Sequence, residues 1–276
     1  MTNGERWRSE LDLYIRQCEP NAKEKSIAWK TAIGLQKVDG LGVSAYLLDT
    51  AKEHIEGKIS IQEAQERIYN YHKAQNKIAE LGERTEEADI VAVRITELLG
   101  EKNFHLSPVF WQNIHKRLFI GVFAHAGQLR GYNITKDEWV LGGDSVIYVH
   151  ANSVPAALEH DFNREREYSY SGNSIDDSIE HFAKFTAGIW QIHPFSEGNT
   201  RSMAVFVIKY LQSLGFSIDG DVFAKHSLYF RNALVRANYN NLQQGIEESA
   251  IFLVRFYDNL VLGKGYDLTS TQLKID

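Results

Sequence analysis

The sequence holds few of the residues on which several kinds of functional site depend. Its 276 residues include one cysteine, Cys18, so neither an internal disulfide nor a zinc site built from several thiolates can form. The ten histidines never stand four residues apart on an expected helix, which excludes the paired-histidine zinc motif of metalloproteases. A Gly-x-x-x-x-Gly-Lys-(Ser/Thr) sequence is missing as well, so a P-loop is excluded.

Long apolar runs and a strong charge of one sign are also missing. The longest apolar stretch, residues 202–216, is interrupted by Lys209 and is shorter than the ~20 residues that cross a bilayer. Residues 1–16 carry charges throughout, unlike a signal peptide. The 30 basic and 36 acidic residues give a net charge of −6, which disfavours binding to a nucleic-acid backbone. We therefore expect a cytoplasmic protein that binds neither nucleic acid nor membranes.

The sequence does contain the apolar periodicity of helices. Four prolines interrupt it, and apolar residues recur about every 3.6 positions, so the expected fold class is mainly α. Helices are expected over residues 21–38, 43–55, 60–71, 86–99, 108–123, 176–190, 203–214, 222–238 and 243–262. One segment differs, because two β-rich runs, 139–141 and 146–149, flank a Gly-Gly-Asp turn and predict a small β-hairpin.

A polar loop near residue 82 divides this pattern into regions. We expect an N-terminal helical region over residues 1–82 and a larger domain over residues 83–265. Residues 266–276 are expected to form a loose C-terminal tail.

The most informative segment is residues 193–201, His-Pro-Phe-Ser-Glu-Gly-Asn-Thr-Arg, a loop that leads into an apolar helix. The first turn of a helix exposes unpaired N–H groups and the positive end of the helix dipole, so it binds anions such as phosphate. Gly198 allows the backbone to approach an anion closely, while Asn199 and Arg201 supply further hydrogen-bond donors.

Two ionisable side chains stand beside this expected anion site. Glu197 places a carboxylate next to the phosphate position, an arrangement that a cation such as Mg²⁺ would stabilise. His193 is the one group of the loop suited to accept a proton near neutral pH. A base, a carboxylate, a glycine, an amide and a guanidinium within nine residues indicate metal-assisted phosphoryl or nucleotidyl transfer to a hydroxyl.

The loop resembles the signature of the Fic (Fido) family, His-x-Phe-x-(Asp/Glu)-Gly-Asn-(Gly/Lys)-Arg-x-x-Arg. Upstream, Ala-Gly-Gln-Leu-Arg at residues 126–130 and Asn-Ile at residues 133–134 resemble the stretch that precedes the family's flap. The resemblance extends over about residues 108–262. It implies a helical enzyme with a β-hairpin flap that transfers AMP from ATP, its co-substrate, to a Ser, Thr or Tyr hydroxyl of a target protein.

Carried over position by position, the resemblance implies a role for each residue of the loop. His193 would deprotonate the target hydroxyl, and Glu197 would hold Mg²⁺ on the phosphates of ATP. The anion-binding turn would consist of Gly198, Asn199, Thr200 and Arg201. The expected hairpin would be the flap that docks the target protein by strand addition, with contact residues Trp139, Ile147 and Tyr148.

Two positions depart from the family pattern. Thr200 stands where the family has Gly or Lys, and Ala204 stands where it has a second arginine, which binds the γ-phosphate in family members. Arg231 and Arg236 are candidates to replace that arginine. The donor therefore stays open: alternatives are transfer of UMP, phosphate or phosphocholine, removal of AMP, or a catalytically silent module that binds a nucleotide or a protein.

The N-terminal region has a resemblance of its own. Residues 32–41 and 57–60 resemble the VbhA-type antitoxin, whose inhibitory helix carries Ser/Thr-x-x-x-Glu-(Gly/Asn). Leu35 stands at the Ser/Thr position, and Asp39 stands at the position of the glutamate. The resemblance implies that Asp39 is inhibitory, and the alternative is a helical cap with no regulatory role. Fic domains often associate through helical surfaces, so a homo-oligomer is also compatible with the sequence.

Overall fold

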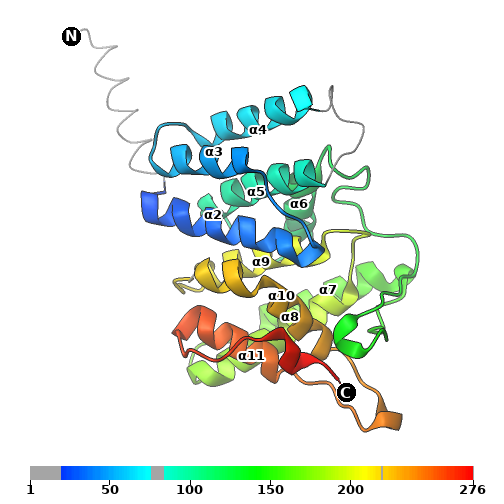
Figure 1. Cartoon of the computed structure of the whole chain (residues 1–276). Helices are drawn as coiled ribbons and strands as arrows, with labels where there is room; N and C mark the ends of the chain where they lie inside the picture. Colours follow the sequence, from blue (N-terminus) through cyan, green and yellow to red (C-terminus); the bar gives the residue numbers. More distant parts are fainter. Residues whose placement is uncertain (1–19, 76–83, 219, 276) are drawn as a thin grey trace, which may run out of the picture.

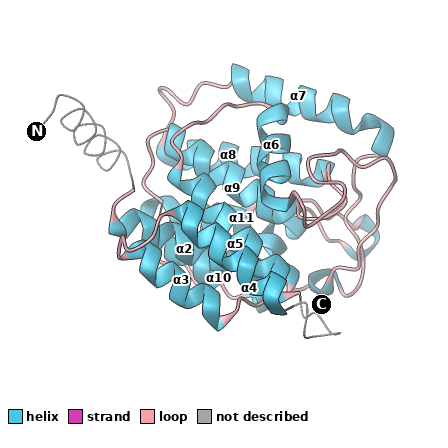
Figure 2. Cartoon of the chain, turned by 90° about the horizontal axis from the view of Figure 1, so that it is seen from above, coloured by secondary structure: helices cyan, strands magenta, loops and turns pink. Residues whose placement is uncertain are grey.

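The structure, a computed structural model, describes residues 20–75, 84–218 and 220–275 and consists mainly of helices (Figure 1, Figure 2). The expected fold class is therefore confirmed. The α-helices are α2 (Ala22–Gln36), α3 (Ala45–Ile55), α4 (Ile61–Gln75), α5 (Thr85–Gly100), α6 (Pro108–Phe119), α7 (Val154–Glu167), α8 (Ile175–Ile192), α9 (Asn199–Ser213), α10 (Gly220–Arg236) and α11 (Ile251–Tyr257). Shorter turns of helix include η1 (Lys37–Asp39), η2 (Trp139–Leu141), η5 (Asp258–Leu262) and η6 (Ser270–Leu273). None of the described helices is both long and apolar enough to cross a bilayer.

Several helices begin at side chains that cap them. At the start of α2, the Asn21 side chain accepts a hydrogen bond from the Glu24 amide, and the Glu24 carboxylate accepts one from the Asn21 amide. Ser60 and Glu63 form the same reciprocal pair in front of α4, as their spacing predicts. These bonds satisfy N–H groups that a helix leaves unpaired, which is why residue type marks the starts of these helices.

The central element is α9, which other helices surround. Its residues from Asn199 to Leu211 are all buried, and it contacts α2, α5, α6 and α8. In Figure 1, α9 lies between α2 and α5 above it and α8 and α11 below it. The buried Lys209 donates to the carbonyls of Leu98 and Glu101 at the end of α5, so its charge is placed where the helix dipole stabilises it. The signature loop, residues 193–201, thus leads into a helix that is buried along most of its length.

Helix α2 belongs to the same hydrophobic core as the later helices. It packs against α5 and α10, and its Trp29 and Leu35 lie in the shared cluster. Gly34 approaches α10 so closely that an added Cβ would lie 2.4 Å from the Ala224 Cα. The expected boundary at residues 82–83 lies outside the described residues, and the division into two domains stays a prediction.

The expected β-hairpin is wrong. Residues 132–149, which we call the flap segment, contain no β-strand, and Trp139–Leu141 forms the helical turn η2 instead. Val140 and Leu141 are both buried although they are neighbours in the chain. Successive residues of a strand point to opposite faces, so a strand could not bury both in one core, whereas a helical turn can.

Three smaller expectations are corrected as well. The helix expected over residues 243–262 begins only at Ile251, and α7 was not expected at all. The C-terminal tail is not loose, since Leu268 and Leu273 are buried and the Ile275 amide donates to the Val140 carbonyl at 2.9 Å. A segment with too few apolar residues to show helical or strand periodicity can still be buried where other elements provide an apolar surface.

We predict that Gly34→Ala destabilises the protein. The new methyl group would meet backbone atoms of α10, the Ala224 Cα at 2.4 Å and the Phe223 carbonyl oxygen at 2.8 Å. Overpacking of about 3 kcal/mol would exceed the roughly 1 kcal/mol that alanine gains over glycine in a helix. Urea denaturation measures the difference. Gly42→Ala is the control, because no atom lies within 4 Å of its added Cβ, and equal effects of the two variants would contradict the prediction.

Candidate active site

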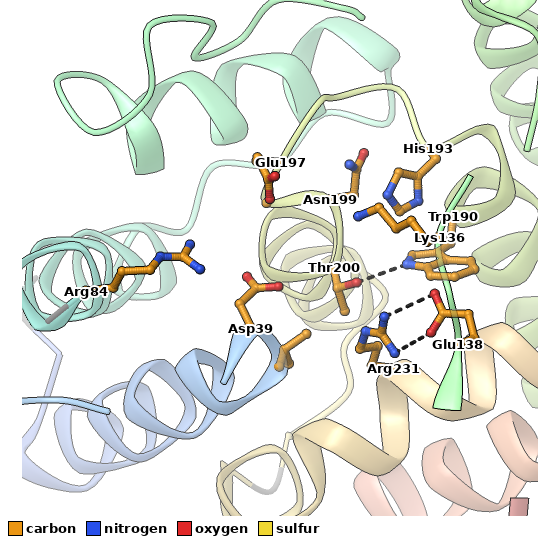
Figure 3. Close-up of a pocket in the computed structure, with 12 residues that line it drawn as sticks. Asp39, Arg84, Lys136, Glu138, Trp190, His193, Glu197, Asn199, Thr200 and Arg231 are labelled. Carbon is orange, nitrogen blue, oxygen red and sulfur yellow. Dashed lines mark hydrogen bonds and ion pairs between the residues drawn. The ribbon is translucent and has the colours of Figure 1, made fainter. Parts of the chain in front are cut away.

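A pocket of about 240 Å³ opens at the N-terminus of α9 (Figure 3). It lies where the signature loop, residues 193–201, meets the flap segment, η1, α5 and α10. The residues that line it are Val38, Asp39, Arg84, Lys136, Glu138, Trp190, His193, Glu197, Gly198, Asn199, Thr200 and Arg231. The fold therefore brings most of the predicted loop residues together with charged groups from distant parts of the chain.

His193 ends α8 with its backbone in the left-handed region, at a φ of 47°, which is unusual for a residue other than glycine. The residue is 2% exposed, and neither ring nitrogen has a hydrogen-bond partner among the described residues. The ring packs against Tyr148 and Trp190, with centroid distances of 4.5 and 5.3 Å. Burial, with a smaller contribution from the charge of Lys136, lowers the pKa of His193 well below 6.5. The imidazole is therefore neutral at physiological pH and has a nitrogen free to accept a proton.

Arg130 holds the main chain around His193 in place. Its guanidinium donates to four main-chain carbonyls, those of Tyr132 (2.6 Å), Val149, Ile192 (3.2 Å) and His193 (2.7 Å). The Arg130 amide also donates to the Pro194 carbonyl at 2.8 Å. These bonds tie the end of α8 to the flap segment and stabilise a left-handed backbone that costs about 1–2 kcal/mol in an L-residue. The sequence drew attention to Arg130 through the stretch before the flap, but gave no indication of this role.

His115 is a second residue that positions the loop. Its Nδ1 accepts a hydrogen bond from the Gly127 amide at 2.8 Å, so Nε2 carries the proton and donates to the Glu197 carbonyl at 2.9 Å. Its ring also stacks on Phe195, with centroids 3.8 Å apart. Burial lowers the pKa of His115 to about 4, which keeps the ring in this neutral, bridging form. No motif in the sequence pointed to His115.

Two residues of the predicted anion-binding turn use their side chains differently from what we expected. The Asn199 amide closes the loop on itself: its oxygen accepts from the Phe195 amide at 2.9 Å and its nitrogen donates to the Phe195 carbonyl at 2.7 Å. The side chain is thus not a free donor for phosphate, and only its backbone N–H remains for that purpose. The Thr200 hydroxyl accepts from the Trp190 indole at 3.0 Å, so a β-branched residue is accommodated where the family has Gly or Lys.

Glu197 and Gly198 both line the pocket just before α9. The Glu197 side chain is exposed in the pocket and has no hydrogen-bond or ion-pair partner in the part of the chain that the structure describes. Gly198 precedes α9 with a φ of 71°, and an added Cβ would lie 2.4 Å from the ring of Phe119. Only glycine fits this position, for reasons of both backbone conformation and space.

Arg201 does not open onto the pocket. It is fully buried, and its guanidinium donates to Glu87 at 2.6 Å and to Gln36 at 3.1 Å. Its Nε forms an ion pair with Asp39 at 2.5 Å, without the alignment of a hydrogen bond. Asp39 therefore reaches the signature loop, but it pairs with Arg201 and not with position 204, where Ala204 is buried on α9. The Arg201 guanidinium, to which the resemblance assigns phosphate binding, is therefore bound by side chains of α2, η1 and α5.

The flap segment places its three predicted contact residues in different surroundings. Trp139 and Ile147 are 44% and 84% exposed, so both are accessible to a partner. Tyr148 is buried: its ring packs on His193, and its hydroxyl donates to Glu138 at 3.4 Å. Tyr148 thus packs behind His193 and offers little surface to a partner, and its role in docking the target stays a prediction.

The pocket also contains charges that the sequence did not identify. Lys136 and Glu138 come from the flap segment and belong to no motif. Arg231, one of the two arginines suggested as a substitute, lines the pocket and pairs with Glu138 at 2.7 Å. Arg236 does not line it and lies over the ring of Phe252.

We predict that His115→Gln makes folding stability less sensitive to acid. In the native state the pKa of His115 is about 4, against about 6.5 when unfolded, so the unfolded chain binds more protons between these two pH values. Stability is therefore lost as pH falls from about 6.5 to about 4, by up to about 3 kcal/mol from this group. Urea unfolding at several pH values measures the slope of the free energy of unfolding against pH. A slope as steep in His115→Gln as in the exposed control His105→Gln would refute the assignment.

Comparison with known proteins shows what part of the chain is similar to. The family model of the Fic/DOC family matches residues 105–211. Protein adenylyltransferase VbhT of Bartonella schoenbuchensis is 25% identical over 160 residues, which is 51% of this chain and 32% of that protein. The chain thus spans about a third of the length of this curated relative.

Two solved structures share the fold. The N-terminal FIC domain of the Bep8 protein, a VirB-translocated effector of Bartonella sp. 1-1C, superposes with a TM-score of 0.50 at 18% identity and covers 69% of this chain and 92% of that one. The BepC protein of Bartonella tribocorum, solved with bound AMPPNP, gives a TM-score of 0.50 at 15% identity and covers 65% of this chain and 88% of that one. The family model thus identifies residues 105–211, which contain the signature loop and most of α9, as a region of Fic/DOC type, and the solved structures show that the fold is shared.

Proposed function

We propose that this protein is a Fic-type transferase that moves AMP from ATP to a Ser, Thr or Tyr hydroxyl of a target protein. The observation that carries the proposal is His193, a buried neutral imidazole with no partner for either ring nitrogen among the described residues, in the pocket that also holds Glu197 and the start of α9. The similarity to a protein adenylyltransferase and to a Fic structure with bound AMPPNP supports the choice of an adenine nucleotide.

In the proposed reaction each of these groups has a role. His193 accepts the proton of the target hydroxyl, whose oxygen then forms a bond to the α-phosphorus of ATP. The bond from the α-phosphorus to the bridging oxygen breaks, and its electron pair leaves with pyrophosphate. Backbone N–H groups in the first turn of α9 face the α-phosphate, where they stabilise the charge that develops in the transition state. Trp139 and Ile147 remain accessible on the flap segment for the target protein.

Mg²⁺ is compatible with the residues of the pocket. The described residues include no group of three or more His, Cys, Asp or Glu side chains that could hold a metal ion by themselves. The unpaired Glu197 carboxylate would instead bind the ion together with phosphate oxygens, as magnesium sites on nucleotides commonly do. When bound, the ion would neutralise phosphate charge, and its affinity would depend on the nucleotide.

We predict that His193→Ala strongly reduces nucleotide transfer. Incubation with Mg²⁺ and α-labelled ATP, γ-labelled ATP or α-labelled UTP, followed by electrophoresis, shows which group becomes attached to the protein itself or to an added target. We expect label from α-labelled ATP alone, reduced about 10²- to 10⁴-fold by His193→Ala and unchanged by the exposed control His105→Ala. Label only from γ-labelled ATP or from UTP would indicate a different donor. If none of the three nucleotides gives label, even in a variant without the inhibition proposed below, the protein would be a catalytically silent module.

We further propose that the N-terminal region, residues 1–82, inhibits the catalytic region, residues 83–265, through Asp39. The Arg201 guanidinium cannot bind a phosphate at Nε while the Asp39 carboxylate lies 2.5 Å from it. The Asp39 contact lacks hydrogen-bond alignment, whereas the Glu87 contact has it, so Asp39 is the partner that a phosphate oxygen would replace.

We predict that Asp39→Ala raises transfer activity by roughly tenfold, which corresponds to a coupling of about 1.4 kcal/mol. Initial rates with α-labelled ATP at several ATP concentrations measure the effect, which is expected mainly in KM. Asp49→Ala, on the exposed side of α3, is the matched control. If Asp39→Ala folds as the wild type does and its rate is unchanged, the N-terminal region is a cap without this regulatory role.

A further inference from the structure

The charges of the pocket form pairs, with two exceptions. Arg231 pairs with Glu138 through two contacts, of 2.7 and 3.1 Å, and Arg84 pairs with Glu87 at 2.8 Å. Asp39 pairs with the buried Arg201, as described above. Two lining charges are left without a hydrogen-bond or ion-pair partner for their side chains in the described chain, the Glu197 carboxylate and the Lys136 ammonium.

Lys136 is aimed into the pocket by a structured part of the flap segment. Its own amide donates to the Ser145 hydroxyl at 3.1 Å. Two residues on, the Glu138 amide donates to the Asp144 carbonyl at 3.0 Å, and the Glu138 carboxylate is fixed by Arg231. Figure 3 shows the Lys136 side chain extending from the flap segment toward Asn199, beside the imidazole of His193. Half-buried and directed inward, this ammonium is a positive charge without an ion-pair partner among the described residues that line the pocket.

Three other cations near α9 are less available to an anionic ligand than Lys136. The charge of Arg231 is already balanced by the buried Glu138, and separating the two would leave a carboxylate unpaired in the interior. Arg236 stacks on Phe252 away from the pocket, and position 204 has a buried alanine. Arg201 requires displacement of Asp39 before it can bind anything. Lys136 needs no such exchange.

We propose that Lys136 binds the phosphates of the nucleotide beyond the α-phosphate, the part that leaves as pyrophosphate. The inference rests on the proposed function, since it assumes that a nucleoside di- or triphosphate occupies this pocket. An ammonium group has three donors on a flexible stem and acts on phosphate mainly as a point charge. It therefore suits the mobile end of a polyphosphate, while the main-chain N–H groups of α9 suit the fixed α-phosphate. Lys136 thus supplies, from the flap segment, a cation that α9 lacks at position 204.

Isothermal titration calorimetry with ATP, ADP and AMP, each with Mg²⁺, tests the assignment. Lys136→Met keeps the length of the side chain and removes its charge, Lys136→Arg restores the charge, and Lys274→Met is an exposed control. We expect Lys136→Met to weaken binding of ATP and ADP by roughly tenfold, as for loss of one charge-assisted hydrogen bond, and binding of AMP by less than about twofold. Lys136→Arg should restore most of the ATP affinity, and Lys274→Met should change none of the three.

Equal losses for AMP and ATP, or no loss in Lys136→Met, would overturn the assignment to the distal phosphates. The titrations and the labelling assay for the proposed function can fail independently of each other. Selective loss of ATP and ADP affinity without any transfer of label by the wild type would contradict AMP transfer alone. Transfer of label with an unchanged ratio of ATP to AMP affinity in Lys136→Met would contradict the role of Lys136 alone. A wild-type protein that binds none of the three nucleotides would contradict both.

Discussion

The loop between α8 and α9 keeps its shape because side chains from earlier in the chain bind its main chain. Buried carbonyl and amide groups outside regular structure need hydrogen-bond partners. Arg130 provides them on the His193 side and His115 on the Glu197 side. Held at both ends, the loop can keep His193 in a left-handed conformation that an isolated peptide would rarely adopt. The position of the candidate base thus depends on two residues outside the loop.

A second constraint is the buried guanidinium of Arg201. A charge without access to water needs a counter-charge, and here Asp39 and Glu87 provide it. Phosphate binding at Arg201 would therefore exchange one anion for another. The same contact joins η1 to the start of α9, so the residue suggested to inhibit the site also helps to stabilise the fold. The proposed inhibition and the packing of the N-terminal helices therefore depend on the same contact.

Local features of the sequence predicted where several helices begin and which residue the turn before α9 requires. Capping pairs such as Asn21 with Glu24 act over three residues, and Gly198 is required by the backbone of a single turn. Properties of this kind can be read from neighbours in the chain. The hairpin prediction failed because it used local β-propensity, whereas burial of Val140 and Leu141 side by side was decided by the core they meet.

The sequence by itself determined that a base, a carboxylate and a helix start would lie within one short loop. Only the tertiary structure decided which of these groups are free. It assigned the Asn199 amide to the loop, enclosed Arg201 between Asp39 and Glu87, and left Lys136 unpaired within the described chain. The reason is physical: a side chain's availability depends on the partners that surround it, and here those partners come from helices and loops distant in sequence.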